Sequence, residues 1–201
     1  MKDLSHITLI SGGAKGSDTE WERLAKEHNL KTKIFTTKDY DNIDKGTTFY
    51  NEIEEAYKLA CKQLDRPEIN TGYVSKLVRR DYLQAKNAQA IYAIGNIIKP
   101  KEKDSKGYIN KTNREIVSGG TGYCVQMAIN LNKAVFVFNQ KDTKWYLWNN
   151  FTYKFVSLKN VIPDLQGISY FAGIGTREIT EEGKQTIKDF YQNSINILNK
   201  Q

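Results

Sequence analysis

Three segments of the chain repeat one layout, in which an apolar strand pattern breaks at a glycine-rich turn and continues as a helix pattern. They are HITLISGGAKGSD at residues 6–18, EIVSGGTGYCVQ at 115–126 and ISYFAGIGTR at 168–177. Glycines allow a ligand to approach the backbone closely, and the N–H groups and positive dipole end of a following helix attract phosphate. A single turn of this kind is often only a tight connection, but three in 201 residues predict a site for a nucleotide-type ligand.

Strand and helix patterns alternate along the chain, which is typical of an α/β layer fold with a mainly parallel sheet. Strands are expected at 7–10, 31–36, 90–94, 134–139 and 168–172, and helices at 17–29, 47–64, 73–87, 121–131 and 180–198. Residues 37–46 are polar and are expected to form a loop. We therefore predict one Rossmann-like, three-layer domain over residues 1–201, with all three glycine turns at the carboxyl ends of its strands.

Two further segments depart from this alternation. Strand patterns at 144–148 and 152–155, separated by Asn149 and Asn150, predict an antiparallel β-hairpin over 143–156. Residues 97–115 are expected to form an exposed excursion, because their centre is rich in lysine and contains Pro100 and Gly107. Its lysines either only solvate the surface, which is the favoured interpretation, or close over a ligand.

The net charge of +7 favours an anionic partner, although lysine-rich helix faces explain it equally well. The two cysteines, Cys61 and Cys124, and the two histidines, His6 and His28, are far apart. These spacings support neither a zinc site nor a Ser/His/Asp hydrolase, so no metal or cofactor is expected. No apolar run approaches the roughly eighteen residues of a membrane span, and no signal peptide is recognisable, so we expect a cytoplasmic protein without a membrane partner.

The segment 79–126 resembles the Lonely-guy phosphoribohydrolases, whose hallmark is an arginine-bearing helix, a strand and then a PGGxGTxxE turn. The corresponding residues here are VRRDYLQAKNAQAIYAIG and SGGTGYCVQ. Arg80 falls on the family's catalytic arginine when the Ala-x-Ala run at 88–90 is aligned, and Gln126 falls where the family has a glutamate. The resemblance also implies a homo-oligomer, because these phosphoribohydrolases are dimers.

The other two turns resemble the DNA-processing protein A branch of the same superfamily. There a GSR-type turn and helix precede a strand and an SGxAxGxD turn. Here FAGIGTREITEEGKQTIKDFYQ follows LISGGAKGSDTEWERLA instead, so the order is that of a circular permutation. The combined pattern resembles the SLOG superfamily of nucleotide-binding Rossmann-like domains, and within it the uncharacterised phage and mobile-element members.

The ligand-binding residues expected from this pattern belong to three backbone cradles and one helix. The first cradle comprises Ser11, Gly12, Gly13, Gly16 and Ser17, with Asp18 either capping the helix or accepting a hydrogen bond from a ribose. The second comprises Ser118, Gly119, Gly120, Thr121 and Gly122. The third comprises Gly173, Gly175, Thr176 and Arg177, the last as a bidentate phosphate clamp.

Arg79 and Arg80 are neighbours on the predicted helix and point about 100° apart, so one of them is expected to reach the site. The resemblance selects Arg80 and leaves Arg79 for a surface ion pair. Gln126 in place of the glutamate favours a non-catalytic binder, because a neutral amide cannot act as a general acid or base. Whether Asp81 or Glu115 replaces the missing carboxylate stays open.

Three functions follow, in order of preference. The first is binding of a nucleotide-derived small molecule, such as an ADP-ribose-like or cyclic nucleotide signal. A phage-encoded protein of this kind would sequester a host immune signal in the host cytoplasm. The second is a nucleoside-monophosphate phosphoribohydrolase or related N-glycosidase. The third is a DNA-processing-type binder of single-stranded DNA, which requires a basic groove and stacking aromatic side chains such as Trp145 and Trp148.

Overall fold

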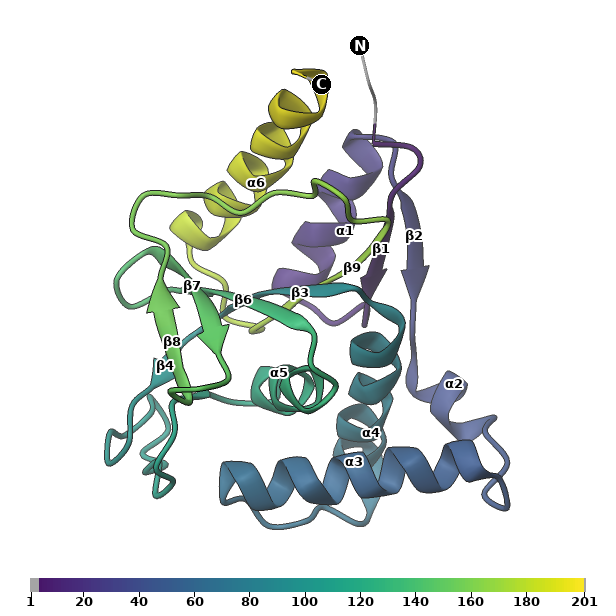
Figure 1. Cartoon of the computed structure of the whole chain (residues 1–201). Helices are drawn as coiled ribbons and strands as arrows, with labels where there is room; N and C mark the ends of the chain where they lie inside the picture. Colours follow the sequence, from purple (N-terminus) through teal and green to yellow (C-terminus); the bar gives the residue numbers. More distant parts are fainter. Residues whose placement is uncertain (1–3, 201) are drawn as a thin grey trace.

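The computed structural model describes residues 4–200, so residues 1–3 and 201 of the predicted domain lie outside the described residues. The fold is α/β, with a seven-stranded sheet in the order β2-β1-β9-β3-β6-β7-β8 (Figure 1). The parallel strands are β1 (Thr8–Ser11), β2 (Lys31–Ile34), β3 (Ala90–Gly95), β6 (Ala134–Asn139) and β9 (Tyr170–Gly175). The hairpin of β7 (Lys144–Asn149) and β8 (Lys154–Ser157) extends this sheet in antiparallel pairing. The predicted fold class is confirmed.

The position of β9 determines the topology of the sheet. Although it is the last strand in the sequence, β9 lies between β1 and β3 and pairs in parallel with both. The five parallel strands can be renumbered so that β9 is strand 1, followed by β1, β2, β3 and β6 as strands 2 to 5. Their order across the sheet is then 3-2-1-4-5, which is that of a doubly wound sheet. The order reverses between β9 and β3, and the carboxyl ends at such a reversal are where open α/β sheets bind ligands.

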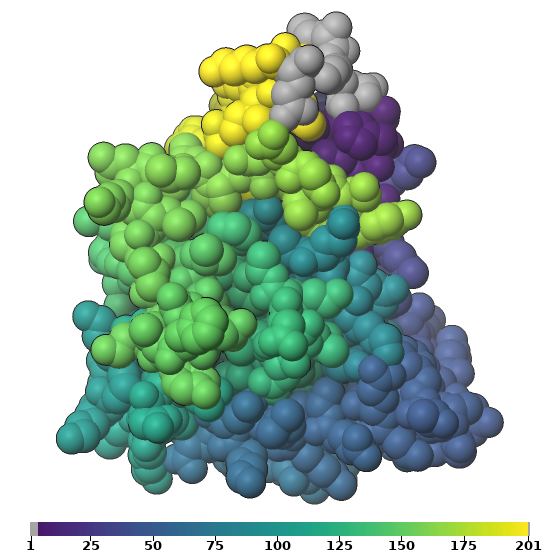
Figure 2. Space-filling view, viewed as in Figure 1, coloured from purple at the N-terminus to yellow at the C-terminus, as the bar shows by residue number. Residues whose placement is uncertain are grey.

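The helices cover both faces of the sheet. One face is covered by α1 (Ser17–Glu27) and α6 (Glu181–Asn199), and the other by α3 (Thr48–Leu64), α4 (Gly72–Asn87) and α5 (Thr121–Asn130) (Figure 1). The purple beginning of the described chain and the yellow end of α6 lie at the same end of the molecule (Figure 2). Within residues 4–200, none of the helices is long and apolar enough to cross a membrane.

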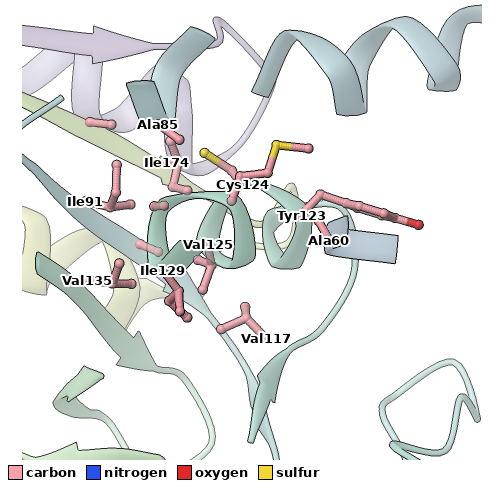
Figure 3. Packing of buried hydrophobic residues seen from close by; sticks show 14 of the residues in the cluster. Ala60, Ala85, Ile91, Val117, Tyr123, Cys124, Val125, Ile129, Val135 and Ile174 are labelled. Atoms are coloured by element: carbon pink, nitrogen blue, oxygen red, sulfur yellow. The ribbon is translucent and has the colours of Figure 1, made fainter. Parts of the chain in front are cut away.

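Each face of the sheet has its own hydrophobic core, as expected when successive strand residues point to opposite sides. In β3, Tyr92 packs against Phe136 and Phe190 on the side of α1 and α6, with ring centroids 5.0 and 4.6 Å apart. Ile91 belongs to the opposite core, which α5 fills. Figure 3 shows Cys124 of α5 in that core, near Ile174.

The predicted loop at 37–46 was wrong at its beginning, where a short helix, α2 (Thr37–Asp41), forms. Its start is stabilised by Asp39, whose carboxylate accepts hydrogen bonds from the backbone N and the Oγ1 of Thr36 at 2.6 and 2.7 Å. A polar composition alone does not reveal such a cap, so the sequence pattern resembled a loop.

The strand before the second glycine turn is β5 (Ile116–Val117), which pairs in antiparallel fashion with β4 (Ile97–Ile98). These two strands form a separate small sheet, so this turn does not follow a strand of the parallel sheet as expected. The third turn differs as well, because α6 begins only at Glu181, with Thr180 as its cap. Only the first and second turns lead directly into helices.

Candidate functional site

A cavity of about 490 Å³ opens at the carboxyl ends of β9 and β3, where the strand order reverses. Residues of all three glycine turns line it, together with one side of α4 and the tip of the excursion. The lining residues include Ala14, Asp18, Val74, Leu77, Val78, Arg80, Asp81, Gln84, Asn96, Asp104, Ser105, Lys106, Ser118, Gly119, Gly120, Thr121, Cys124, Ile174, Gly175, Thr176, Arg177 and Glu178. Segments from both ends and the middle of the sequence therefore meet at one cavity.

The second glycine turn presents unpaired backbone donors. Among residues 4–200, no hydrogen-bond acceptor faces the N–H groups of Gly119, Gly120 or Thr121, which begin α5. A Cβ added at Gly119 or Gly120 would meet no atom within 4 Å, so the backbone here borders open space. Unpaired amides at the positive end of a helix form an anion-binding site.

Arg66, in the connection before α4, holds this turn in place. Its Nη1 donates to the carbonyl of Gly119 at 2.7 Å, and its Nη2 donates to the carbonyl of Val117 at 3.1 Å. The guanidinium also lies over the ring of Tyr123, 5.0 Å from the centroid. The turn is thus fixed through its carbonyl groups, while its N–H groups stay available.

The first glycine turn has most of its backbone donors paired within the protein. The N–H of Gly13 donates to Ser11 Oγ at 3.3 Å, and that of Gly16 donates to Thr19 Oγ1 at 3.2 Å. The N–H of Ser17 donates to the carbonyl of Thr176 at 3.0 Å. Gly16 has φ of 104° and lies against the backbone of Arg177, which explains the glycine at this position. This turn connects strands and helix tightly and offers few donors to a ligand.

The third glycine turn is also bonded internally. The N–H of Thr176 donates to the carbonyl of Ile94 at 2.9 Å. Gly173 lies within β9 beneath Trp21, where a Cβ would be 2.7 Å from the indole ring, so its role is packing. Arg177, by contrast, is exposed at the cavity, and its guanidinium has no partner in the described part of the chain.

Asp18 joins the first and third turns. Its carboxylate accepts from the N–H of Ala14 at 3.3 Å and from the N–H of Gly175 at 3.2 Å. The cap position of α1 is Gly16, so Asp18 is not the helix cap. Burial raises the pKa of Asp18 from its ordinary 3.8 to about 6, although the Arg80 guanidinium and the Ala14 amide lower it.

Arg80 is buried at the floor of the cavity, with 4% of its surface exposed. Its Nη1 donates to Gln84 Oε1 at 2.8 Å and lies 3.6 Å from Asp81 Oδ1. Its Nε has no hydrogen-bond partner among the described residues. An anionic ligand would accept a hydrogen bond from this unused donor and would balance the buried positive charge.

The Asp81 side chain is 14% exposed and contacts no donor among residues 4–200 other than Arg80. Burial raises the pKa of Asp81 from its ordinary 3.8 to about 7. This value includes a lowering effect of the Arg80 guanidinium and a raising effect of the Asp18 charge. Near neutral pH this carboxyl group therefore exists in both protonation states.

Arg79 serves the packing of α4 instead of the cavity. Its Nε donates to Glu54 at 2.6 Å, its Nη1 donates to the carbonyl of Ile69 at 2.8 Å, and it lies over the ring of Tyr57. Arg79 forms the expected ion pair, with Glu54, but the expected location at the surface was wrong, because the Arg79 side chain is only 7% exposed and that of Glu54 only 19%. Arg80 is the arginine of the pair that reaches the cavity, in agreement with the alignment.

The two remaining catalytic candidates lie outside the cavity. Gln126 is buried, and its Nε2 donates to Asn130 Oδ1 at 3.1 Å. Glu115 accepts from the N–H of Phe155 at 2.7 Å and lines a separate hollow beside Lys141. Of the two carboxylates considered as replacements for the missing glutamate, only Asp81 is in the cavity.

The expected binding residues thus divide into two groups. Those that line the cavity are Asp18, Arg80, Ser118, Gly119, Gly120, Thr121, Gly175, Thr176 and Arg177. Those outside its lining are Ser11, Gly12, Gly13, Gly16, Ser17, Gly122, Gln126 and Gly173. Most of the second group are at positions where tight packing or internal hydrogen bonding uses them.

The structure adds functional candidates that the sequence analysis did not name. Gln84 follows Arg80 by one helical turn on α4, and this spacing is the signal that could have identified it. Arg66 has no such signal, because it is distant in sequence from the turn that it holds. Lys106 and its neighbours bring the excursion to the cavity, so part of this lysine-rich segment borders the site.

Comparison of the chain with protein-family models, with curated proteins and with solved structures gave no match.

Proposed function

We propose that the protein binds a phosphorylated, nucleotide-derived small molecule in the cavity at the ends of β9 and β3. The observation that carries this proposal is the set of unpaired N–H groups at Gly119, Gly120 and Thr121, three residues that line the same cavity as Arg80 and Arg177. Helix-terminal amides and arginines together provide directional donors and positive charge for a phosphate. The cavity volume of about 490 Å³ is within the range typical of small-molecule sites.

The topology supports the same ligand class. Nucleotides bind open α/β sheets at the crevice where the strand order reverses, and the cavity is at this reversal. The strand order obtained by counting β9 first, and the common location of the first and last described segments, agree with the proposed kinship to circularly permuted SLOG domains.

The test is direct recovery of a bound compound. Purified protein is mixed with a panel of ADP-ribose isomers, cyclic nucleotides and mononucleotides, separated from free ligand, and denatured by heat. The released compound is then identified by mass spectrometry. We expect recovery of at least one member by the unaltered protein and loss of that recovery in Arg80→Ala. Absence of binding to every member would end the proposal.

Within this function, we propose that the protein sequesters its ligand without converting it. The basis is Gln126, a neutral residue that lies outside the cavity lining and hydrogen-bonds Asn130. A phage-encoded origin, an action against a host immune signal in the host cytoplasm, and a homo-oligomeric state belong to the same proposal through the resemblance. Sedimentation analysis tests the oligomeric state, and recovery of unaltered ligand after prolonged incubation tests sequestration.

A nucleoside-monophosphate N-glycosidase is the second candidate, and the observation that favours it is Asp81. A buried carboxyl group with a pKa raised to about 7 beside an arginine can serve as a general acid or base. Release of free base from nucleoside monophosphates, lost in Asp81→Asn, would support this activity. No release at high protein concentration would reject it.

Binding of single-stranded DNA is ranked third. Trp145 and Trp148, the tryptophans of the hairpin, are buried with 3% and 7% of their surface exposed, so they do not offer stacking faces. A gel shift with oligonucleotides at low and moderate salt distinguishes this function, because groove binding would show marked salt dependence.

A further inference from the structure

One side of α4 carries an unused donor and an unused acceptor on two residues that line the cavity. Asp81 and Gln84 are three residues apart on this helix, so their side chains share one face. The carboxylate of Asp81 has no donor within residues 4–200 except Arg80, at 3.6 Å. The Nε2 of Gln84 is buried and has no acceptor among the described residues.

The orientation of the Gln84 amide is determined by its neighbour. Its Oε1 accepts from Nη1 of Arg80 at 2.8 Å, so the donating Nε2 is the atom left for a ligand. Gln84 is only 2% exposed, and a buried donor without a partner destabilises a protein until one arrives. This unsatisfied amide is independent of the unpaired helix terminus, and it also indicates a ligand.

The functional group that fits this pair is a hydroxyl. A hydroxyl donates one hydrogen bond and accepts others, so it can donate to Asp81 while accepting from Gln84. Two adjacent hydroxyls could use both carboxylate oxygens of Asp81 as well as the Gln84 amide. An apolar group would leave all of these atoms unpaired.

The helix terminus that carries the phosphate donors lies beside the part of α4 that contains Asp81. The Sγ of Cys124 lies 3.5 Å from the backbone carbonyl of Asp81, which places the first turn of α5 beside Asp81. Cys124 follows Gly120 by four residues, or about 6 Å along a helix. A ribose ring separates a 5′-phosphate from its 2′ and 3′ hydroxyls by a comparable span.

We propose that Asp81 and Gln84 form a subsite for the vicinal hydroxyls of a ribose whose 5′-phosphate binds the amides that begin α5. This inference depends on the proposed nucleotide-binding function and makes it more specific, because it selects ribonucleotide-type ligands over their 2′-deoxy forms. The guanidinium of Arg80, whose Nη1 lies 3.6 Å from Asp81 Oδ1, offsets the repulsion between Asp81 and the bound phosphate.

The experiment is calorimetric titration with the four ribonucleoside 5′-monophosphates, their 2′-deoxy forms, ribose 5-phosphate and inorganic phosphate. The best ribonucleotide should bind at least about tenfold more tightly than its 2′-deoxy form. In Asp81→Asn this ratio should fall below about twofold, while affinity for inorganic phosphate stays the same or rises. Asp189→Asn, on α6 outside the cavity, is the matched control and should retain the full ratio.

The outcomes separate this inference from the function on which it rests. Equal affinity for ribonucleotide and deoxyribonucleotide in the unaltered protein overturns the ribose subsite and leaves nucleotide binding intact, even if no variant folds. Binding of inorganic phosphate alone also overturns the subsite. Tight binding of ribose 5-phosphate supports the subsite and identifies a sugar phosphate as the source of the hydroxyls. No binding by any of these probes overturns the subsite, and failure in the heat-release panel would remove nucleotide binding as well.

Discussion

The guanidinium group of Arg80 lies so close to the backbone of Gly12 that a Cβ at residue 12 would be 1.6 Å from Nη1. Gly12 is outside the cavity lining, yet it determines whether Arg80 can remain there. The glycine of the first turn thus contributes to the site by leaving room for an arginine of α4.

Gly12→Ala should therefore displace Arg80 and weaken ligand binding by at least about tenfold. We also expect a loss of about 1–3 kcal/mol in the free energy of unfolding, because the added methyl overpacks a buried region. Urea denaturation and calorimetry measure the two effects. Gly46→Ala is the control, since a Cβ there meets only Asp44 Oδ1 at 3.5 Å. Unchanged ligand affinity in Gly12→Ala would contradict the argument.

Arg79→Ala and Arg80→Ala should have different effects. Removal of Arg79 leaves Glu54 largely buried without its ion-pair partner, so we expect a destabilisation of about 3–5 kcal/mol. Arg80→Ala should destabilise less, because Arg80 has fewer hydrogen bonds and an unpaired Nε. It should nevertheless abolish ligand binding. Equal losses of stability in the two variants, measured by urea denaturation, would argue against these assignments.

Asp81→Asn should stabilise the protein at pH 8 and should stabilise it less at pH 5. The pKa of Asp81 is about 7 in the folded protein and 3.8 ordinarily, so the folded state binds the proton more tightly. Stability from this group is therefore lost as the pH rises from about 4 to about 7. The expected gain at pH 8 is at most about 4 kcal/mol, since each pKa unit corresponds to about 1.4 kcal/mol. Thermal unfolding from pH 5 to 8 measures it, and a gain that does not grow with pH would refute the assignment.

Thr121→Glu should increase stability and prevent ligand binding. A carboxylate in the first turn of α5 interacts favourably with the positive helix terminus, by about 0.3–1 kcal/mol. The same charge repels a phosphate from the unpaired amides. Thr121→Gln has a similar size without the charge and serves as control. Retained affinity for phosphorylated ligands in Thr121→Glu would place the anion site elsewhere.

Arg66→Lys should weaken binding although Arg66 does not line the cavity. Lysine cannot donate to the carbonyls of Val117 and Gly119 in the forked geometry of arginine, so the second turn should lose order. We expect a roughly tenfold loss of affinity for phosphorylated ligands. Arg114→Lys is the control, because Arg114 lies over the exposed Tyr153 and away from the turn. Equal affinities in both variants would exclude this positioning role.

The fold was accessible from the sequence because apolar periodicity is a local property. The continuous apolar run of β3 and the helical spacing of α3 both involve residues that are close in sequence. The capped helix at Thr37 was missed, since one Asp39 side chain determines it against a polar background.

The candidate site was less accessible, because similar glycine turns perform different tasks. Gly173 accommodates Trp21, whereas Gly119 borders open space, and their sequence contexts do not distinguish these roles. The difference depends on which distant side chain, Trp21 or Arg66, packs against the turn. The prediction of Arg80 as a site residue came from alignment with a motif, and the adjacent Arg79 shows that residue type alone would not have chosen it.

The central location of β9 has a consequence for biosynthesis. During translation β1 and β3 leave the ribosome long before residues 170–175, and until then the two strands lack the neighbour that both require. This strand and the turn after it also supply Ile174, Gly175 and Arg177 to the cavity wall. A nascent or prematurely terminated product thus lacks both the complete sheet and a pocket able to bind ligand. Binding activity therefore arises only when residue 177 has been synthesised.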